Sequence, residues 1–299
     1  MEQSFLSMYF LPFSLFLIML GLGLTLERED FKRLYIYPIA TLIGVVLQLV
    51  VLPIIGFAIA YFMLRDNPTL AMGIIVLAAC PGGATSNLIT YLARGEMALS
   101  VTLTAISSCL AVVSIPLIVS LGLRWFMDSN EVIAPPIGEL ILQVVMVTIV
   151  PVGLGMLIRK KSPVFAAKAE KPMKIVSALL LAVIVLGLVL KQRSEIPDFF
   201  RQAGIPTLLL NVAMLTLGFL AGRLAKLPLR ERVSISIEAG IQNGTLGIAI
   251  AAGVLGSEAM AIAPAIYSLI MFATGFLAIA VFSRMVAREE VREVTRQSA

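Results

Sequence analysis

The stretch that decides the fold is Glu238-Ala239-Gly240-Ile241-Gln242-Asn243-Gly244, which places one carboxylate and two amides inside an apolar run from residue 233 to 256. An ionisable side chain within a membrane-spanning run must face a cavity or a partner, so it marks a functional site by default. The glycines in the stretch indicate that the helix is interrupted there. We therefore expect a polar site inside the protein with Glu238 at its centre.

The composition is that of an integral membrane protein. Of the 299 residues 59% are hydrophobic and 14% are charged, and the mean hydropathy is +0.99, whereas soluble domains carry about 25% charged residues. The apolar runs are about 20 residues long and do not alternate strictly, which favours helices over barrel strands. The pI of 9.4 could indicate nucleic-acid binding, but the basic residues fall in short gaps between apolar runs. We predict an all-α polytopic membrane protein with no nucleic-acid partner.

Several residue types limit the chemistry. The chain has no His, which removes the commonest general base and metal ligand. Its two cysteines, Cys80 and Cys109, lie in apolar runs without paired spacing and are expected to be reduced, buried thiols. The start of the chain lacks a basic signal region, so the first apolar run is expected to stay as a helix.

Nine membrane spans can be drawn, the second with an expected kink at Pro53. They cover residues 8–26, 36–64, 69–93, 97–122, 137–158, 174–191, 205–224, 233–256 and 259–283. Of the 23 Lys and Arg residues, 18 fall on one side of this arrangement and 5 on the other. The excess of positive charge marks the cytoplasmic side, which predicts an outside N-terminus and a cytoplasmic C-terminus in the inner membrane. Residues 284–299 are expected to be a solubilising cytoplasmic tail, compatible with a short amphipathic helix.

The third span carries a second interruption, Cys80-Pro81-Gly82-Gly83, which should also break its helix. Among the last five spans the interruption lies in the fourth, and among the first four spans it lies in the third. One further helix in front of the first group would therefore bring the two interruptions to the same position. Consecutive five-helix units cross the membrane in opposite senses, which is the inverted-topology repeat of many secondary transporters. Gln48 and Asn211, each followed by a Gly-Phe pair, match in this alignment.

The side chains at the two breaks carry the oxygen ligands of a hard cation: hydroxyls, amides and a carboxylate. They are Ser86, Asn87, Glu238, Gln242 and Asn243, to which Ser100 and Thr104 add a helical face at positions i and i+4. Other roles stay open at this point. Ser100 and Thr104 can bond to carbonyls one turn back, Ser86 and Asn87 can cap a helix, Gln48 can join helices, and Glu238 can pair with Arg232.

These residues carry a resemblance to the bile acid:sodium symporter family, and to its bacterial members in particular. The first family signature resembles Cys80-Pro81-Gly82-Gly83, Ser86-Asn87, residues 90–95 and 98–101, and Thr104. The second signature resembles Glu238-x-Gly240-x-Gln242-Asn243. An early helix of the family's panel resembles Gly21-x-Gly23-Leu24-Thr25-Leu26. The resemblance implies a core and a panel domain within one transporter domain. The panel would take residues 137–191 and part of 1–64, and the core residues 205–283 and part of 36–122.

The resemblance also implies two sodium sites and no organic cofactor. The first would use Ser86, Asn87, Ser100, Thr104 and Glu238, and the second Glu238, Gln242, Gln48 and the main-chain carbonyls of Ala239 and Ile241. The substrate would lie beside the crossing of the broken helices, near Asn243, Gly244, Gly83, Ala84 and Thr85. Some bacterial members have a hydroxyl at the place of Ala84, and its absence here weakens the case for a substrate hydrogen bond from that position.

We expect a sodium-coupled symporter that imports an organic anion, bile-acid-like or a small carboxylate, by alternating access. A cation/proton antiporter that uses Glu238 as its proton carrier is the main alternative, although the neutral oxygens of Ser100, Thr104 and Gln242 are not needed for a proton. An intramembrane enzyme is disfavoured because no His and no partner acid accompany Glu238. An uncoupled channel or receptor is the remaining class.

Overall fold

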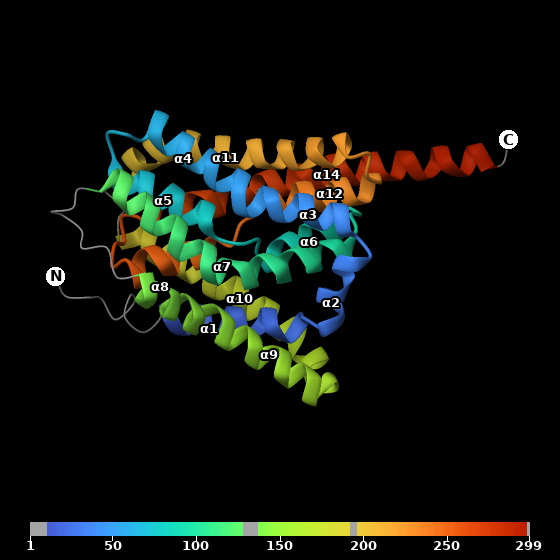
Figure 1. Cartoon of the computed structure of the whole chain (residues 1–299), viewed down its shortest axis with the longest axis horizontal. Helices are drawn as coiled ribbons and strands as arrows, with labels where there is room; N and C mark the ends of the chain where they lie inside the picture. Colours follow the sequence, from blue (N-terminus) through green and yellow to red (C-terminus); the bar gives the residue numbers. More distant parts are fainter. Residues whose placement is uncertain (1–10, 128–136, 192–195, 298–299) are drawn as a thin grey trace.

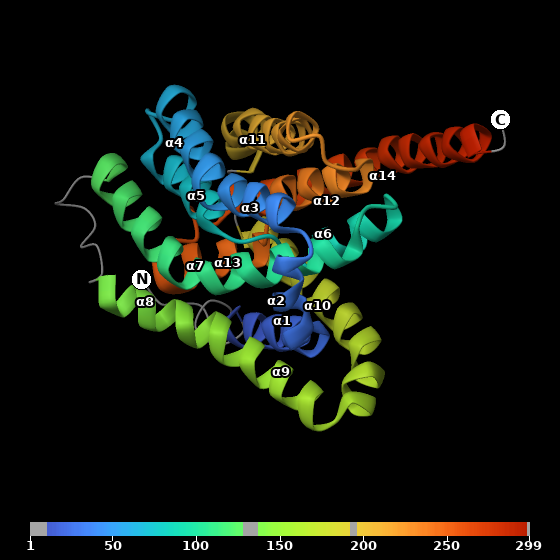
Figure 2. The same ribbon diagram turned by 45° about the vertical axis from the view of Figure 1, so that its right-hand side comes forward.

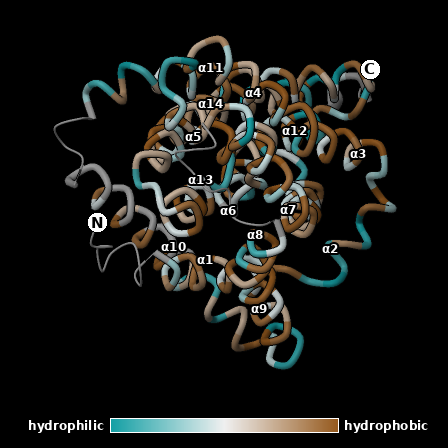
Figure 3. Tube along the Cα trace, turned by 60° about the vertical axis from the view of Figure 1, so that its left-hand side comes forward, coloured by the Kyte–Doolittle hydropathy of each residue, from teal (hydrophilic) through white to brown (hydrophobic). Residues whose placement is uncertain are grey.

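The computed structural model describes residues 11–127, 137–191 and 196–297, and in these residues the regular structure is helical apart from one isolated β-bridge. Five helical segments are long and apolar enough to cross a membrane: Pro38–Met63, Met97–Phe126, Gly138–Lys161, Pro197–Leu224 and Ile262–Arg292. Hydrophobic residues follow the helices and hydrophilic ones gather at connections such as the α9–α10 turn (Figure 3). The protein is therefore a polytopic, membrane-embedded helical protein.

One group of helices packs together on one side of the molecule (Figure 2). Its members are α1 (Leu11–Thr25), α8 (Ile137–Val144), η4 (Val145–Ile149), α9 (Val150–Lys161) and α10 (Pro163–Lys191). Glycine allows α1 and α9 to approach closely, since a Cβ on Gly23 would meet the Val152 carbonyl and one on Gly155 the backbone of α1. We call these helices the panel group.

Most of the remaining helices form a second group on the other side, which we call the core group (Figures 1 and 2). It consists of α3 (Pro38–Val46), η3 (Leu47–Val51), α4 (Leu52–Met63), α5 (Pro68–Ala79), α6 (Ala84–Leu92), α7 (Met97–Phe126), α11 (Ile196–Leu224), α12 (Leu229–Gly240), α13 (Gly244–Ala249), η5 (Ile250–Val254) and α14 (Ile262–Gln297). The α5 helix is almost completely buried by its neighbours α4, α7 and α14. The centre of the core group is thus the first half of a broken helix.

A short connection, α2 (Arg28–Lys32) and η2 (Arg33–Tyr35), joins α1 of the panel group to α3 of the core group. Glu27 at the start of α2 is ion-paired with Arg159 of α9. Asp30 accepts hydrogen bonds from the Glu27 amide at 2.7 Å and from Arg33 at 2.8 Å, and Thr102 of α7 donates to the Asp30 carbonyl at 2.8 Å. The connection is therefore tied to both groups.

Pro53 and Pro151 each follow a π-helical turn, η3 and η4, so the expected irregularity at Pro53 takes that form. Proline lacks an N–H, and its ring crowds the carbonyl four residues earlier, so regular helical hydrogen bonding is interrupted before it. A wider, π-helical turn is one of the ways in which a helix accommodates this interruption.

Two expectations need correction. The first concerns the end of the apolar run near residue 283, because α14 continues past it without a break to Gln297; the segment 284–297 is thus helical, and its place in the cytoplasm stays a prediction. No Gly or Pro follows Gly275, so nothing in the sequence stops the helix at the end of the apolar run. Cys109 is exposed rather than buried, since it lies on the outward face of α7 beside Leu110.

The two expected interruptions are present. The third expected span is divided into α5 and α6 by residues 80–83, and the eighth into α12 and α13 by residues 241–243. The break positions follow the Pro-Gly-Gly and Gly-x-Gln-Asn sequences from which they were predicted.

Candidate functional site

The two breaks meet in the middle of the core group. Gly82 and Gln242 form an antiparallel β-bridge, and the Asn243 amide donates to the Pro81 carbonyl at 2.9 Å. Extended residues at each break thus satisfy each other's backbone groups, which would otherwise have no partner once the helices stop. The consequence is a crossing, joined by backbone hydrogen bonds, at which four helix ends come together.

Local sequence explains the shape of this crossing. Pro81 has no N–H to continue α5, and Gly82 leaves the space that the Glu238 carboxylate fills, because a Cβ on Gly82 would overlap it. The Asn243 side chain caps α13, accepting a hydrogen bond from the Leu246 amide at 3.0 Å. Each break residue therefore has a role that its type can fill.

Glu238, near the end of α12, is 2% exposed and is surrounded by hydroxyl groups. Ser86 of α6 lies 2.7 Å from its Oε2, and Thr104 of α7 lies 2.6 Å from its Oε1. Ser100 of α7 lies 3.4 Å from Oε2. Residues more than 130 positions apart in the chain thus surround one carboxylate.

The same three hydroxyls have further acceptors within reach. Ser86 lies 2.7 Å from the Gly83 carbonyl, and Ser100 lies 2.8 Å from Asn87 Oδ1, with Thr104 at 3.4 Å from that atom. With the Ser100 carbonyl, which lies 3.1 Å from Thr104, three hydroxyl hydrogens therefore face five acceptors: the two carboxylate oxygens, the Asn87 amide oxygen and the carbonyls of Gly83 and Ser100. A hydroxyl has one hydrogen and two acceptor lone pairs, so the cluster holds more acceptors than hydrogens. Such a cluster is complementary to one additional positive centre.

A second polar pair lies beside the first cluster. Gln48 of η3 donates through Nε2 to Gln242 Oε1 and to the Cys80 carbonyl, both at 2.7 Å. Gln242 donates to the Ala239 carbonyl at 2.6 Å. The structure thus brings Gln48, Gln242 and Ala239 together, and Ile241, also buried, follows in the same break.

The structure decides between several of the roles that the sequence left open. Arg232 donates to the Leu227 carbonyl, and within the described residues the hydrogen-bond partners of Glu238 are hydroxyls rather than this arginine. Thr104 also lies 3.1 Å from the Ser100 carbonyl one turn back, so its single hydroxyl hydrogen has both this carbonyl and the carboxylate within reach. Gln48 joins helices and reaches Gln242 at the same time.

The residues expected to bind substrate lie at the starts of α6 and α13. Gly83, Gly244 and Asn243 are buried and Thr85 is half-buried. Ala84 opens α6, and its side chain lies outside the described part of the structure. Position 244 has no space for a side chain, because a Cβ there would overlap Ser268.

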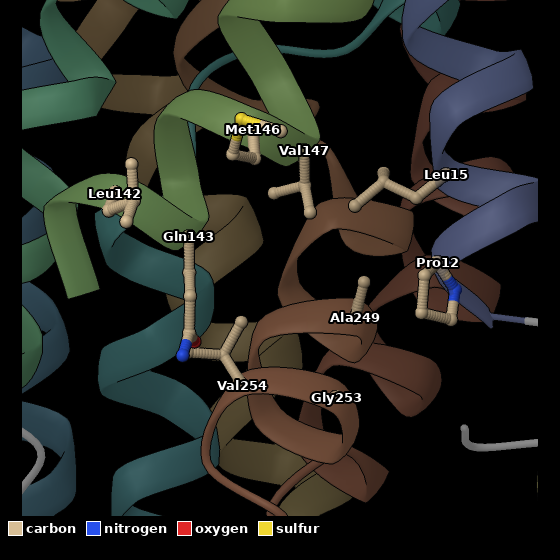
Figure 4. Close-up of a pocket in the computed structure, with 9 residues that line it drawn as sticks. All are labelled: Pro12, Leu15, Leu142, Gln143, Met146, Val147, Ala249, Gly253 and Val254. Carbon is tan, nitrogen blue, oxygen red and sulfur yellow. The ribbon is translucent and has the colours of Figure 1, made fainter. Parts of the chain in front are cut away.

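A cavity of about 310 Å³ lies between the panel group and the core group (Figure 4). Its walls come from α1, α8, η4, α13 and η5, and its lining is apolar apart from Gln143. The lining residues are Pro12, Leu15, Leu142, Gln143, Met146, Val147, Ala249, Gly253 and Val254. This cavity does not include the residues expected to bind substrate, but Ala249 ends the helix that Asn243 caps.

Sequence reasoning missed two buried polar residues near the breaks. Thr90 lies 3.3 Å from the Ser100 hydroxyl, and Tyr267 of α14 donates to the Gly240 carbonyl at 2.7 Å. A phenol within an apolar run needs a partner, so Tyr267 carried a signal that could have been used. Among the described residues no group of three or more His, Cys, Asp or Glu side chains could hold a metal ion.

Comparison with known proteins adds independent information. A family model described as the Sodium Bile acid symporter family matches residues 12–197. An uncharacterised sodium-dependent transporter of Bacillus subtilis, YocS, is 32% identical over 280 residues, which cover 92% of this chain and 83% of that protein. A probable sodium/metabolite cotransporter of rice chloroplasts, BASS2, is 30% identical over 89% of this chain and 62% of its own length. The human ileal sodium/bile acid cotransporter is 31% identical over 77% of this chain and 65% of its own length.

Proposed function

The chain belongs to the sodium bile acid symporter family, and from this premise we propose that it imports an organic anion together with sodium by alternating access. The family members are transporters rather than enzymes, which agrees with the expectation that this protein is not an enzyme. Membership establishes a sodium-dependent membrane transporter, and the arrangement of the site supports the more detailed proposal.

The observation that carries the proposal is the excess of acceptors around Glu238. Sodium bound among Ser86, Asn87, Ser100, Thr104 and Glu238 would supply the missing positive centre, and each hydroxyl could turn its hydrogen outward to one of its other acceptors. Oxygen ligands of this mixture suit a hard cation. A carboxylate at this depth otherwise remains an incompletely paired buried charge, which is costly.

A second sodium ion is proposed beside the first, held by Glu238, Gln48, Gln242 and the carbonyls of Ala239 and Ile241. The amide nitrogens of Gln48 and Gln242 now donate to Gln242 Oε1 and the Ala239 carbonyl. A cation there would take over the interaction with those oxygens, so both amide groups would have to turn. Because Glu238 would belong to both sites, binding at one organises the other.

The wider architecture fits this mechanism. We propose nine spans in two inverted units, the first without its first helix, and broken helices that cross near the membrane midplane. Gly56 of α4 packs against α5 beside Ala78, and Gly218 of α11 packs against α12 beside Ser236. This similarity supports the proposal that the α4–α5 pair and the α11–α12 pair are equivalent in the two units. The core group would move against the panel group, with α2 tied to both.

The proposed topology follows from charge. The N-terminus would face the outside and the C-terminus the cytoplasm of a bacterial inner membrane, because 18 of the 23 basic residues then lie inside. In this orientation, the membrane potential contributes about 2.3 kcal/mol per 100 mV for each positive charge that enters. Two sodium ions with one monoanion would carry one net charge inward and could therefore concentrate the anion.

The substrate is proposed to be an organic anion, either a small carboxylate or an amphipathic metabolite, bound at the starts of α6 and α13. Helix N-termini present free N–H groups and a partial positive charge to an anion. Asn243, Gly244, Gly83, Thr85 and the backbone at Ala84 would surround it. The neighbouring apolar cavity at Ala249 provides space between the two groups of helices.

Transport in proteoliposomes tests the proposal. Purified protein is reconstituted and challenged with a set of labelled organic anions under an inward sodium gradient, with choline as the control cation. We expect at least one anion to accumulate only with sodium, with a sigmoidal dependence on sodium and an inward current. Accumulation driven by a pH gradient without sodium would contradict the proposal and favour the cation/proton antiporter, and saturation-free flux would favour a channel.

A further inference from the structure

The last carbonyl of α12, that of Gly240, is held by two side chains from other helices. Asn211 of α11 donates to it through Nδ2, and Tyr267 of α14 donates through its hydroxyl, both at 2.7 Å. The Asn211 amide also lies 3.3 Å from the Tyr267 oxygen. Carbonyls at a helix end have no helical partner, so these two donors fix a group that the break would leave free.

Keeping an amide at position 211 has a cost that an apolar side chain would avoid. Asn211 is completely buried, and its Oδ1 has no hydrogen-bond partner in the structure. A buried acceptor without a donor destabilises the fold relative to an apolar group of the same shape. The bond from Nδ2 to Gly240 is therefore the contribution that distinguishes Asn211 from a leucine at this place.

Gly240 lies midway between two proposed sodium ligands: it is two positions after Glu238, which would bind both ions, and two before Gln242, which would bind the second. The surroundings leave little freedom there, because Leu215 of α11 occupies the place of a Cβ on Gly240. A shift of the Gly240 carbonyl would therefore move the Glu238 carboxylate and the Gln242 amide with it.

The first break has a similar anchor with a different second contact. Gln48 donates to the Cys80 carbonyl at 2.7 Å, as Asn211 does to Gly240, but Gln48 also bonds Gln242. Within the described residues the Asn211 side chain bonds Gly240 and Tyr267, neither of which is a proposed sodium ligand. An effect of Asn211 on sodium must then pass through the backbone at the break.

We propose that Asn211 and Tyr267 are positioning residues, which anchor the Gly240 carbonyl and thereby set the positions of Glu238 and Gln242 for sodium. This inference rests on the proposed function, since it assigns a role in that site. It also explains why an amide from α11 and a phenol from α14 converge on one carbonyl at the end of α12.

The test compares Tyr267→Phe and Asn211→Leu with a matched control, Ser236→Ala. Ser236 bonds the Leu215 carbonyl at 2.6 Å, so the control removes a hydrogen bond between the same two helices, α11 and α12, one turn before the break. Purified variants in detergent are titrated with sodium chloride at constant ionic strength with choline chloride, and the unfolding temperature is followed. Tyr267→Phe keeps the ring and its packing, so it decides the question if Asn211→Leu does not yield folded protein.

We expect Tyr267→Phe and Asn211→Leu to raise the half-saturating sodium concentration about three- to tenfold and Ser236→Ala to leave it unchanged. Unchanged sodium titrations of both test variants would overturn the inference while leaving the proposed function intact. An equal rise in Ser236→Ala would also overturn it, because the effect would then be one of general helix packing. A wild-type protein without any sodium response would overturn the proposed function itself, and this inference with it.

Discussion

Replacing Glu238 by Gln removes the carboxylate charge at the crossing and keeps the size of the side chain. The carboxylate is buried, and the hydroxyls of Ser86 and Thr104 lie within 2.7 Å of its oxygens, so an ion in this cluster would be within about 4 Å of the charge. Two unit charges 4 Å apart attract by about 4 kcal/mol at an effective dielectric constant of 20. At about 1.4 kcal/mol for each factor of ten, Glu238→Gln should weaken sodium binding roughly a thousandfold.

The assay is thermal unfolding of purified Glu238→Gln in choline chloride and in sodium chloride, compared with the wild type. We expect sodium to raise the unfolding temperature of the wild type and to have no effect on the variant. In choline the variant should unfold at the same temperature or higher, because a buried charge has been replaced by a neutral amide of the same shape. A variant that keeps the wild-type sodium response would refute the assignment of Glu238 as an ion ligand.

Three further predictions concern the crossing, the ions and the panel group. Gly82→Ala should abolish the stabilisation by sodium, because the new Cβ would overlap the Glu238 carboxylate. Gly83→Ala should retain this stabilisation, because a Cβ at position 83 meets its neighbours at 3.4 Å or more. Equal behaviour of the two variants in a sodium titration would contradict the prediction. If two ions bind, the free energy of unfolding measured chemically in detergent should rise by about 2.8 kcal/mol per tenfold increase in sodium above saturation, and a slope of about 1.4 would indicate one ion. Gly155→Ala should destabilise the protein by about 1–3 kcal/mol, because the new Cβ would clash with the α1 backbone. Gly153→Ala should leave the stability unchanged, because a Cβ at position 153 has open space. Thermal unfolding of both variants in choline chloride checks this difference.

Local sequence carried much of this protein's organisation. The cost of a carboxylate in lipid singles out Glu238, and Pro81 followed by two glycines favours the end of a helix, so both breaks could be predicted from neighbours in the chain. Family membership was likewise predicted from short motifs, and the comparisons confirm it. The continuous course of α14 was not predicted, because the change from apolar to charged residues near 283 brings no Gly or Pro that would end the helix there.

Partners across the chain were harder to predict. Gln48 and Asn211 were matched by their positions, but which carbonyl each one holds depends on how η3 and α11 pack against the breaks. Tyr267 reaches Gly240 from a helix that begins 22 residues after the end of α12, and no local pattern states that distance. The exposure of Cys109 was missed for the same reason, since the outward face of α7 is set by its neighbours.

The sequence by itself determined the class of protein, the two interrupted helices and the residue types that suit a hard cation. These depend on hydropathy, on backbone chemistry and on the cost of burying charge, all of which act over a few residues. Only the tertiary structure decided that Ser86, Ser100 and Thr104 surround Glu238 with fewer hydrogens than acceptors, and that Asn211 and Tyr267 converge on Gly240. Hydrogen bonds are directional and act only over short distances, so which groups pair is settled when helices distant in sequence pack together.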